Sequence, residues 1–406
     1  MQIKIKPLVF GSPGFTGKQA NPEHNLCQRS QQHKKPCGHD HTEEIESKGG
    51  EQESKSQQMV SHDIILTSNK TGNANRLSVE SLLAIKTQTG TPPIMTKKNL
   101  IIDCDPGQDD AVMLLLALAC PEDFDILGIT TVAGNVPLDL TQRNARIMCE
   151  LAGRTDVPVF AGCDKPMRRK LITAENVHGK TGIDGVDIYQ PAMPLQKQHA
   201  VEFMIESLLD AADDSVTLVP TGPLTNLGQA ISREPRILPK IREIVLMGGA
   251  MREAGNTSPS AEFNILVDPD AAHLVLHCGR PVTIAPLDMT HQVLVSRQRI
   301  EQIRQLDSPV GAAIVGMMEF FNRFDSEKYG SDGAPLHDPC TIAYLLKPTL
   351  FEGRMCNVEV ETDSNLTRGH TAVDFWQVTD RARNVNWLHR VDADGFFDLL
   401  IERLKS

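Results

Sequence analysis

The sequence of 406 residues lacks any run of about 18 consecutive apolar residues, so we expect no transmembrane helix. Its amino terminus has no sustained apolar segment of the kind found in secretory signals, and we therefore expect a soluble, cytoplasmic protein. No basic stripe offsets the formal net charge of −11, which argues against nucleic acid or an anionic membrane as a partner. The nine cysteines are scattered, which is typical of reduced thiols and not of a disulfide framework.

Residues 1–97 differ in composition from everything that follows. They are rich in Gln, Ser, Lys, His, Gly and Asn, and such a composition cannot bury enough apolar surface to offset chain entropy. We therefore expect a low-complexity, disordered extension, followed by a single domain at 98–406. The extension contains a group of possible metal ligands: Cys27, His33, Cys37, His39 and His41. Their spacing fits no established zinc pattern, so incidental residues in a polar tail are the better interpretation.

Strand-like apolar runs alternate with helical patterns from residue 99 onward. The predicted strands are 100–104, 126–132, 216–220, 243–247 and 281–285. The predicted helices are 111–119, 140–152, 224–231 and 270–277, and two short extended segments, 358–361 and 371–375, precede a last helix at 395–404. This alternation predicts an α/β fold with one mostly parallel sheet, covered by helices on both faces.

Four aspartates lie within eight residues, where the first predicted strand passes into the first helix: Asp103, Asp105, Asp109 and Asp110. A helix N-terminus favours carboxylates, which explains the last two. It does not explain Asp103 and Asp105, which the alternation of a strand places on one side. Two like charges about 4 Å apart cost about 4 kcal/mol at an effective dielectric of about 20. The cluster therefore requires protonated carboxyls or a bound cation, and oxygen-only ligands favour Ca²⁺ or Mg²⁺ over zinc.

Hydrogen-bonding side chains also follow the other predicted strands. They are Asn135, Thr221, Asn226, Asn256, Glu262 and Asn264, and the fifth strand is followed by APLDMTH. Because ligands bind at the carboxyl ends of parallel strands, these loops predict one polar, metal-containing pocket. Amides and carboxylates can pair with the vicinal hydroxyls of a sugar, whereas phosphate is disfavoured because the Walker pattern is missing.

Two histidines occur in further loops of this kind. His337 precedes Asp338 in LHDPC, and His178 lies between glycines in NVHGKTGIDG. By themselves, these motifs are also compatible with an aspartate helix cap beside an incidental histidine, and with a solvated loop histidine.

The motifs DCDPGQDD, TTVAGN, VHGKTGIDG, PTGPLTN, LMGGAM…GN…AEFN and PLHDPC occur in the order seen in the nucleoside hydrolases. The sequence resembles this family of metal-dependent enzymes, which cleave the N-glycosidic bond of ribonucleosides, from about residue 99 to residue 406. The resemblance implies a Rossmann-like open sheet, one Ca²⁺ per subunit and a homodimer or homotetramer.

The resemblance also implies roles for individual residues. Asp105, Asp110, Asp338 and the backbone carbonyl of Thr221 would bind Ca²⁺, with Asp103 as a supporting acid. The ribose would contact Asp109, Asn135, Met247, Asn256, Glu262 and Asn264. Asp105 would be the general base for a calcium-activated water, and the ribose would approach an oxocarbenium ion. The leaving base must accept a proton or a hydrogen bond, and His337 is the first candidate for that role, with His178 and Tyr329 as helpers.

The segment at 319–340, EFFNRFDSEKYGSDGAPLHDPC, resembles the pyrimidine-preferring branch of the family. We therefore expect uridine and cytidine to be cleaved faster than inosine. One alternative is a catalytically silent nucleoside- or ribose-binding protein on the same fold. Another is a phosphohydrolase like the haloacid dehalogenases, which also open with DxD. The second is disfavoured because Pro106 and Gly107 follow that motif here, and because two further acids would repel a phosphate.

Overall fold

The computed structural model describes residues 97–329 and 333–405, and the side chains of 324–329 are not described. Predictions made for residues 1–96, including the extension with its cysteine and histidine group, lie outside this range. The described residues belong to one compact unit. Within the described ranges, no helix combines the length and the apolar character that crossing a bilayer requires.

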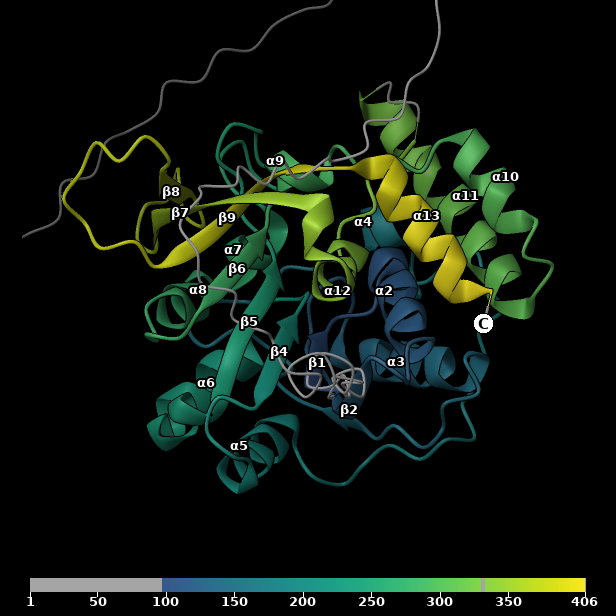
Figure 1. Cartoon of the computed structure of the whole chain (residues 1–406), viewed down its shortest axis with the longest axis horizontal. Coiled ribbons are helices and arrows are strands. Elements are labelled where there is room, and N and C mark those ends of the chain that lie inside the picture. Colours follow the sequence, from purple (N-terminus) through teal and green to yellow (C-terminus); the bar gives the residue numbers. More distant parts are fainter. Residues whose placement is uncertain (1–96, 330–332, 406) are drawn as a thin grey trace, which may run out of the picture. The chain divides into compact units, whose positions relative to one another are not determined.

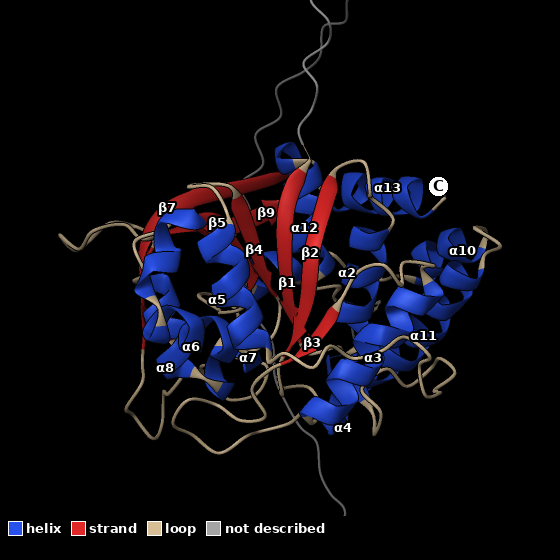
Figure 2. Ribbon diagram, turned by 90° about the horizontal axis from the view of Figure 1, so that it is seen from below, coloured by secondary structure: helices blue, strands red, loops and turns tan. Residues whose placement is uncertain are grey.

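A nine-stranded sheet forms the centre of this unit, in the order β3-β2-β1-β4-β5-β6-β9-β7-β8 (Figure 2). Its strands are β1 Lys98–Cys104, β2 Phe124–Thr131, β3 Val159–Ala161, β4 Val216–Pro220, β5 Ile241–Met247, β6 Val282–Ala285, β7 Phe351–Val360, β8 Thr371–Asp374 and β9 Val385–Val391. In this spatial order, each strand from β3 as far as β9 pairs with the next in parallel. The strand β7 pairs antiparallel with both β9 and β8. The predicted mostly parallel sheet is confirmed. The sequence analysis did not identify β3 or β9, and it found only the end of β7.

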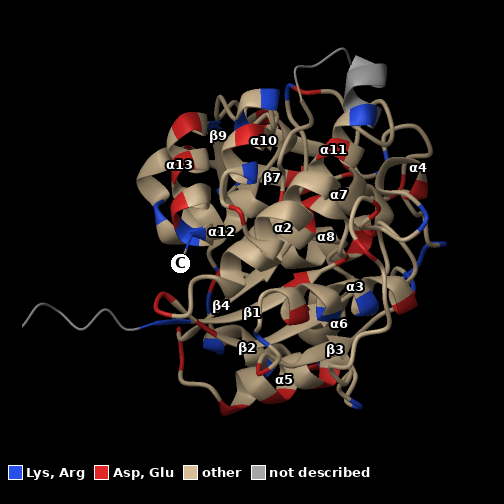
Figure 3. Ribbon diagram, turned by 90° about the vertical axis from the view of Figure 1, so that its right-hand side faces the viewer, with Lys and Arg blue, Asp and Glu red and all other residues tan. Residues whose placement is uncertain are grey.

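Helices cover both faces of the sheet (Figures 1 and 2). They are α2 Gln108–Leu118, α3 Leu138–Leu151, α4 Glu175–His178, α5 Ala200–Asp210, α6 Thr225–Arg233, α7 Phe263–Val267, α8 Pro269–Leu276, α9 Leu287–Thr290, α10 Arg297–Arg304, α11 Pro309–Tyr329, α12 Pro339–Leu346 and α13 Ala393–Leu404, with 3₁₀ turns at Pro235–Lys240 and Pro348–Leu350. On one face α2 packs against α3, α11, α12 and α13, and on the other α6 packs against α5 and α8. Lys and Arg residues are interspersed with Asp and Glu residues along the outer helices and loops (Figure 3).

The strand β1 and the helix α2 lie at the centre of these layers. Leu100 and Ile102 of β1 belong to the core on the α2 face, whereas Ile101 belongs to the core on the α6 face. Every residue of α2 is buried, as expected of a helix that is apolar all round. The order of the strands reverses between β1 and β4, because β2 and β3 continue on one side and β5 and β6 on the other. Open α/β sheets bind their ligands at such a point.

Candidate active site

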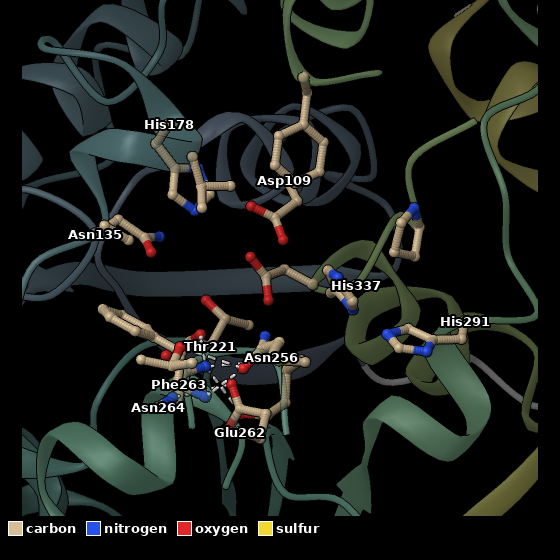
Figure 4. Close-up of a pocket in the computed structure, with 17 residues that line it drawn as sticks. Asp109, Asn135, His178, Thr221, Asn256, Glu262, Phe263, Asn264, His291 and His337 are labelled. Carbon is tan, nitrogen blue, oxygen red and sulfur yellow. Dashed lines mark hydrogen bonds between the residues drawn. The ribbon is translucent and has the colours of Figure 1, made fainter. Parts of the chain in front are cut away.

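A cavity lies at this point of the sheet, beyond the carboxyl ends of β1, β4 and β5 (Figure 4). The predicted site residues that line it are Asp109, Asn135, His178, Thr221, Met247, Asn256, Glu262, Asn264, His337 and Asp338. Asp105 and Asp110 are fully buried and do not line the cavity, but both contact residues that do. The side chain of Tyr329 lies outside the described residues.

Three buried carboxylates meet at the floor of the cavity. Asp109 and Asp110 belong to the first turn of α2, and Asp338 directly precedes α12, which packs against α2. One carboxylate oxygen from each lies within 4.8 Å of the others. The ion pairs in the described part of the chain do not involve any of them. Negative charge is therefore concentrated here without a basic side chain to balance it.

The Asp105 carboxylate lies in a tight enclosure next to this cluster. Its Oδ2 accepts a hydrogen bond of 2.6 Å from the backbone N–H of Asn135, while its buried Oδ1 has no hydrogen-bond partner. A Cβ at Gly134 would lie 2.0 Å from Oδ2, and one at Gly222 would lie 2.5 Å from Oδ1. Only glycine leaves room at these two positions, which explains the glycines of TTVAGN and PTGPLTN.

Asn135 connects Asp105 with Asp110. Its Nδ2 donates to the carbonyl oxygen of Asp105 at 3.1 Å and to Asp110 Oδ2 at 3.2 Å. Asp110 also accepts from the Thr221 hydroxyl at 2.8 Å and from the Gly107 N–H at 3.1 Å. The loops after β1, β2 and β4 are thereby held together around one carboxylate.

Burial raises the pKa values of Asp105, Asp109, Asp110 and Asp338, and the charges of neighbouring carboxylates raise those of Asp105, Asp109 and Asp338 further. Burial is the largest cause in each case, and it raises the pKa of Asp109 to about 7 and that of Asp110 to about 6. The pKa values of Asp105 and Asp338 are raised well above the ordinary aspartate value by burial and then by the charges of the neighbouring carboxylates. A divalent cation would remove this repulsion. The unpartnered Asp105 Oδ1 and Asp109 Oδ1 offer oxygen ligands for one, so the residues present fit a hard metal ion.

Asp103 has a separate environment, because β1 ends at Cys104 and the strand alternation does not extend to Asp105. Its Oδ1 accepts from the Thr130 hydroxyl at 2.7 Å and from Asn226 Nδ2 at 2.8 Å. Burial raises the pKa of Asp103 to about 7. The carboxylate thus joins β1, β2 and α6 beneath the site and does not line the cavity.

A second group of polar side chains, Asn256, Glu262 and Asn264, lines the side of the cavity nearest β5 and is called the polar rim below. Glu262 caps α7, because its carboxylate accepts from the N–H groups of Asn264 at 2.9 Å and Ile265 at 3.2 Å. It also accepts from the Gly249 N–H at 3.0 Å, which a left-handed backbone (φ 81°) at Gly249 allows. Asn264 Nδ2 donates to the backbone carbonyl oxygens of Thr221 at 2.7 Å and Met247 at 3.2 Å. These contacts hold the rim in place.

Asn256 extends the same rim. It is partly exposed, and its Oδ1 accepts from the Phe263 N–H at 2.9 Å. Asn256, Glu262 and Asn264 converge on the cavity from one side, opposite Asp109 (Figure 4). Their spacing and chemistry suit adjacent hydroxyl groups of a sugar.

Aromatic rings form the other end of the cavity. His178 stacks on Phe321, with 5.5 Å between the ring centroids, and its Nδ1 lies 2.8 Å from Gln108 Oε1. Because the amide of Gln108 donates to the His178 carbonyl at 2.9 Å, its oxygen faces the ring and Nδ1 carries the proton. Burial lowers the pKa of His178 to about 3, so this imidazole is neutral.

His337 and His291 lie side by side at the same end (Figure 4). Their ring centroids are 5.7 Å apart, and His337 Nδ1 is 2.7 Å from the Thr290 hydroxyl. Burial, followed by the two neighbouring histidines, lowers the pKa of His337 well below the ordinary value. The sequence analysis did not single out His291, whose Nδ1 lies 3.3 Å from Glu253 Oε2. The loop APLDMTH, which contains this residue, was noted, and Phe321 lies in the segment 319–340 that was linked to the choice of base, but neither residue was named as a site residue.

Together, the parallel sheet, the all-oxygen carboxylate cluster and the polar rim define a metal-dependent hydrolase with a pocket for a hydroxyl-rich ligand. A family model described as inosine-uridine preferring nucleoside hydrolase matches residues 100–398. The chain belongs to this family, and it is an N-glycosyl hydrolase.

Individual relatives agree with this assignment. The pyrimidine-specific ribonucleoside hydrolase RihA of Photobacterium profundum is 48% identical over 308 residues, which cover 76% of this chain and 98% of that protein. An uncharacterized protein of Schizosaccharomyces pombe is 47% identical over 305 residues, which cover 75% of this chain and 98% of the relative. Among solved structures, a plant nucleoside hydrolase has a TM-score of 0.72 at 31% identity and covers 77% of this chain and 100% of its own. A purine-preferring ribonucleoside hydrolase from Gardnerella vaginalis has a TM-score of 0.70 at 32% identity, and the match covers 76% of this chain and 98% of the hydrolase.

Proposed function

We propose that this protein hydrolyses the N-glycosidic bond of pyrimidine ribonucleosides, uridine and cytidine, to the free base and ribose, with Ca²⁺ as its cofactor. The observation that carries the proposal is the buried all-oxygen cluster beneath a rim of amides and carboxylates. It provides for a hard cation and for a polyhydroxyl ligand in one cavity. The 48% identity to a pyrimidine-specific relative supports the choice of base.

The cation would be held by Asp105, Asp110, Asp338 and the backbone carbonyl of Thr221. Asp109 is the further acid within reach, since one of its oxygens lies in the same cluster. When bound, a divalent ion neutralises these carboxylates and lowers the pKa of a neighbouring water. The backbone carbonyl oxygen of Thr221 can also be a cation ligand, because it accepts one hydrogen bond from Asn264 and has a second lone pair.

Asp105 is the general base of the proposed reaction. Its Oδ2 is fixed by the Asn135 N–H, so the unpartnered Oδ1 is the atom that accepts the proton of the attacking water. The water oxygen forms a bond to the anomeric carbon as the bond from that carbon to the base breaks. The two glycines packed against the carboxylate prevent it from turning away.

The ribose hydroxyls are bound by the polar rim and by Asp109. Asn256, Glu262 and Asn264 are all held by backbone hydrogen bonds, so they bind the sugar without reorganising. The ribose becomes positively charged as the base departs, and the surrounding carboxylates stabilise that charge. Met247 lines the same cavity.

The departing base accepts a proton or a hydrogen bond at the aromatic end. His337 is our candidate donor, and because its pKa is lowered it would act through a ring N–H of the neutral imidazole. The neutral His178 presents its unprotonated Nε2 as a hydrogen-bond acceptor. Neither tryptophan lines the cavity: Trp387 is buried in the core on the α6 face, and Trp376 is 70% exposed. The described lining therefore lacks the stacking pair that would favour a purine, which supports a pyrimidine. The contribution of Tyr329 stays a prediction.

The base preference is tested by measuring kcat/KM for uridine, cytidine, inosine and guanosine from the release of reducing sugar. We expect uridine and cytidine to exceed inosine by about tenfold or more, an amount that one or two base contacts provide. Equal or faster cleavage of inosine would contradict the pyrimidine assignment and leave the hydrolase assignment intact.

Homodimeric or homotetrameric assembly is part of the same proposal, and analytical ultracentrifugation of the full chain tests it.

A further inference from the structure

Two histidines and a glutamate meet on the surface, away from the active site. His273 lies in the last turn of α8, His277 follows one turn later as its C-terminal cap, and Glu359 comes from β7, against which α8 packs (Figure 1). One ligand atom from each of the three side chains lies within 4.8 Å of the others. None of them lines the active-site cavity.

The hydrogen bonds of His277 determine which nitrogen faces Glu359. Its Nδ1 is 2.8 Å from the backbone carbonyl oxygen of His273, and because a carbonyl can only accept, Nδ1 carries the proton. In the neutral ring, Nε2 therefore presents a lone pair, and it lies 3.1 Å from Glu359 Oε2. Two acceptors this close require a cation, which is either a second proton on the imidazole or a metal ion bound by both.

The side chains of His277 and Glu359 are oriented by further hydrogen bonds, as metal-binding side chains usually are. A ligating histidine typically donates its other ring N–H to a backbone carbonyl, as His277 does. Glu359 is oriented in a similar way, because its Oε1 accepts from Asn357 Nδ2 at 3.1 Å, and Asn357 is itself tied to the Ala382 carbonyl at 2.9 Å. The ring of His273 lies 4.4 Å from that of His277 and has no hydrogen-bond partner among the described residues.

We propose that His273, His277 and Glu359 form a zinc site that is separate from the active-site cluster. Two imidazole nitrogens and one carboxylate are a ligand set that suits Zn²⁺ and leaves a fourth position open to water. The all-oxygen cluster of the active site suits Ca²⁺ instead, so the two sites select different ions. A cavity borders the zinc ligands, and Arg280, Arg381 and Arg383 line it. Their positive charge opposes a cation, so we expect micromolar and not nanomolar affinity.

Isothermal titration of Zn²⁺ into the full chain with excess Ca²⁺ tests this proposal. The variants His277→Ala and Glu359→Gln are compared with wild type, so zinc bound elsewhere on the chain is common to all three. We expect each variant to lose one equivalent of bound zinc. Asn357→Ala keeps all three ligands but loses the contact that orients Glu359, and we expect it to weaken zinc binding by about tenfold.

Identical titrations for wild type and both ligand variants would overturn the proposal and identify the His277–Glu359 contact as an ion pair with a protonated imidazole. Circular dichroism confirms that the variants are folded. Because the three residues lie away from the active site, uridine hydrolysis should be the same in wild type and variants. A failure of the zinc site is thereby distinguished from a failure of the proposed catalytic function.

Discussion

The two ends of the active-site cavity are built in different ways. At the proposed cation and ribose end, the carboxylates and amides lie in the segments after β1, β2, β4 and β5, except for Asp338, which precedes α12. Backbone N–H groups donate to Asp105 and Glu262, and Asn264 donates to a backbone carbonyl. At the base end, rings come from α4, α9, α11 and the segment before α12, and they are held mainly by other side chains. If the proposed function is correct, the chemistry common to all ribonucleosides rests on the sheet, whereas the choice of base rests on side chains that can change without altering the fold.

The largest effect is expected from Asp105→Asn, at the cation and ribose end. The substitution removes the general base and one cation ligand, so we expect kcat for uridine to fall by about 10³–10⁴-fold. The variant should remain folded, because the enclosure around the side chain is unchanged in size and one charge fewer is buried in the cluster. Steady-state kinetics and thermal unfolding measure the two outcomes. Activity within tenfold of wild type would rule out Asp105 as the base.

A smaller effect is expected from His337→Ala, at the base end. Loss of a single proton donor lowers kcat by about 10²-fold for a nucleoside with a poor leaving group. A substrate with an activated leaving group, such as p-nitrophenyl riboside, needs no proton and should be cleaved at nearly the wild-type rate. Equal losses on both substrates would show that His337 orients the ribose or the cation instead.

Metal-free protein should lose stability as pH rises towards neutrality. The pKa values of Asp103 and Asp109 are raised to about 7 and that of Asp110 to about 6, mainly by burial. An acid whose pKa is higher in the folded state stabilises the fold while it is protonated, and this stability is lost as pH rises through the folded-state pKa. We therefore expect the Tm of chelator-treated protein to fall by several degrees as pH rises from about 4 to about 7, and to level off above that, where these three groups are ionised in both the folded and the unfolded state.

Calcium should abolish this decline, because it replaces the protons that the cluster otherwise binds. Below about pH 6.5 the buried neutral histidines act in the opposite direction, with and without calcium, so the quantity compared is the difference in Tm between calcium-bound and metal-free protein at each pH. A calcium-induced rise in Tm that is the same at every pH would mean that the pKa values of these carboxyls are not raised in the folded state.

The smallest effect is expected from His291→Ala. His291 lines the cavity beside His337, but it is partly exposed and paired with Glu253. We expect a change of about two- to fivefold in kcat/KM, larger for one base than for another, because a partly exposed polar contact contributes about 1 kcal/mol or less. His199→Ala, which removes a helix cap on α5, is the matched control. A loss as large as that of His337→Ala would identify His291 as a proton donor.

The same contrast explains how much the sequence could predict. The run from Asp103 to Asp110 and the segment from Glu262 to Asn264 were identified because each lies in one short stretch whose backbone sets the geometry. His291 and Phe321 were missed because their partners, His337 and His178, are distant in the chain and no local pattern connects them. The strand β9 was missed for a similar reason, since it pairs with β6 about a hundred residues earlier. Contacts between distant side chains leave no periodic signal in a single sequence.

The central claim is that a divalent ion held by the carboxylate cluster is needed to hydrolyse a pyrimidine ribonucleoside. The most direct test is the rate of ribose release from uridine by protein that has been stripped of metal with a chelator and then supplied with Ca²⁺. We predict that the stripped protein releases no ribose above background and that Ca²⁺ restores the activity. Full activity in protein that contains no bound metal by elemental analysis would contradict the account.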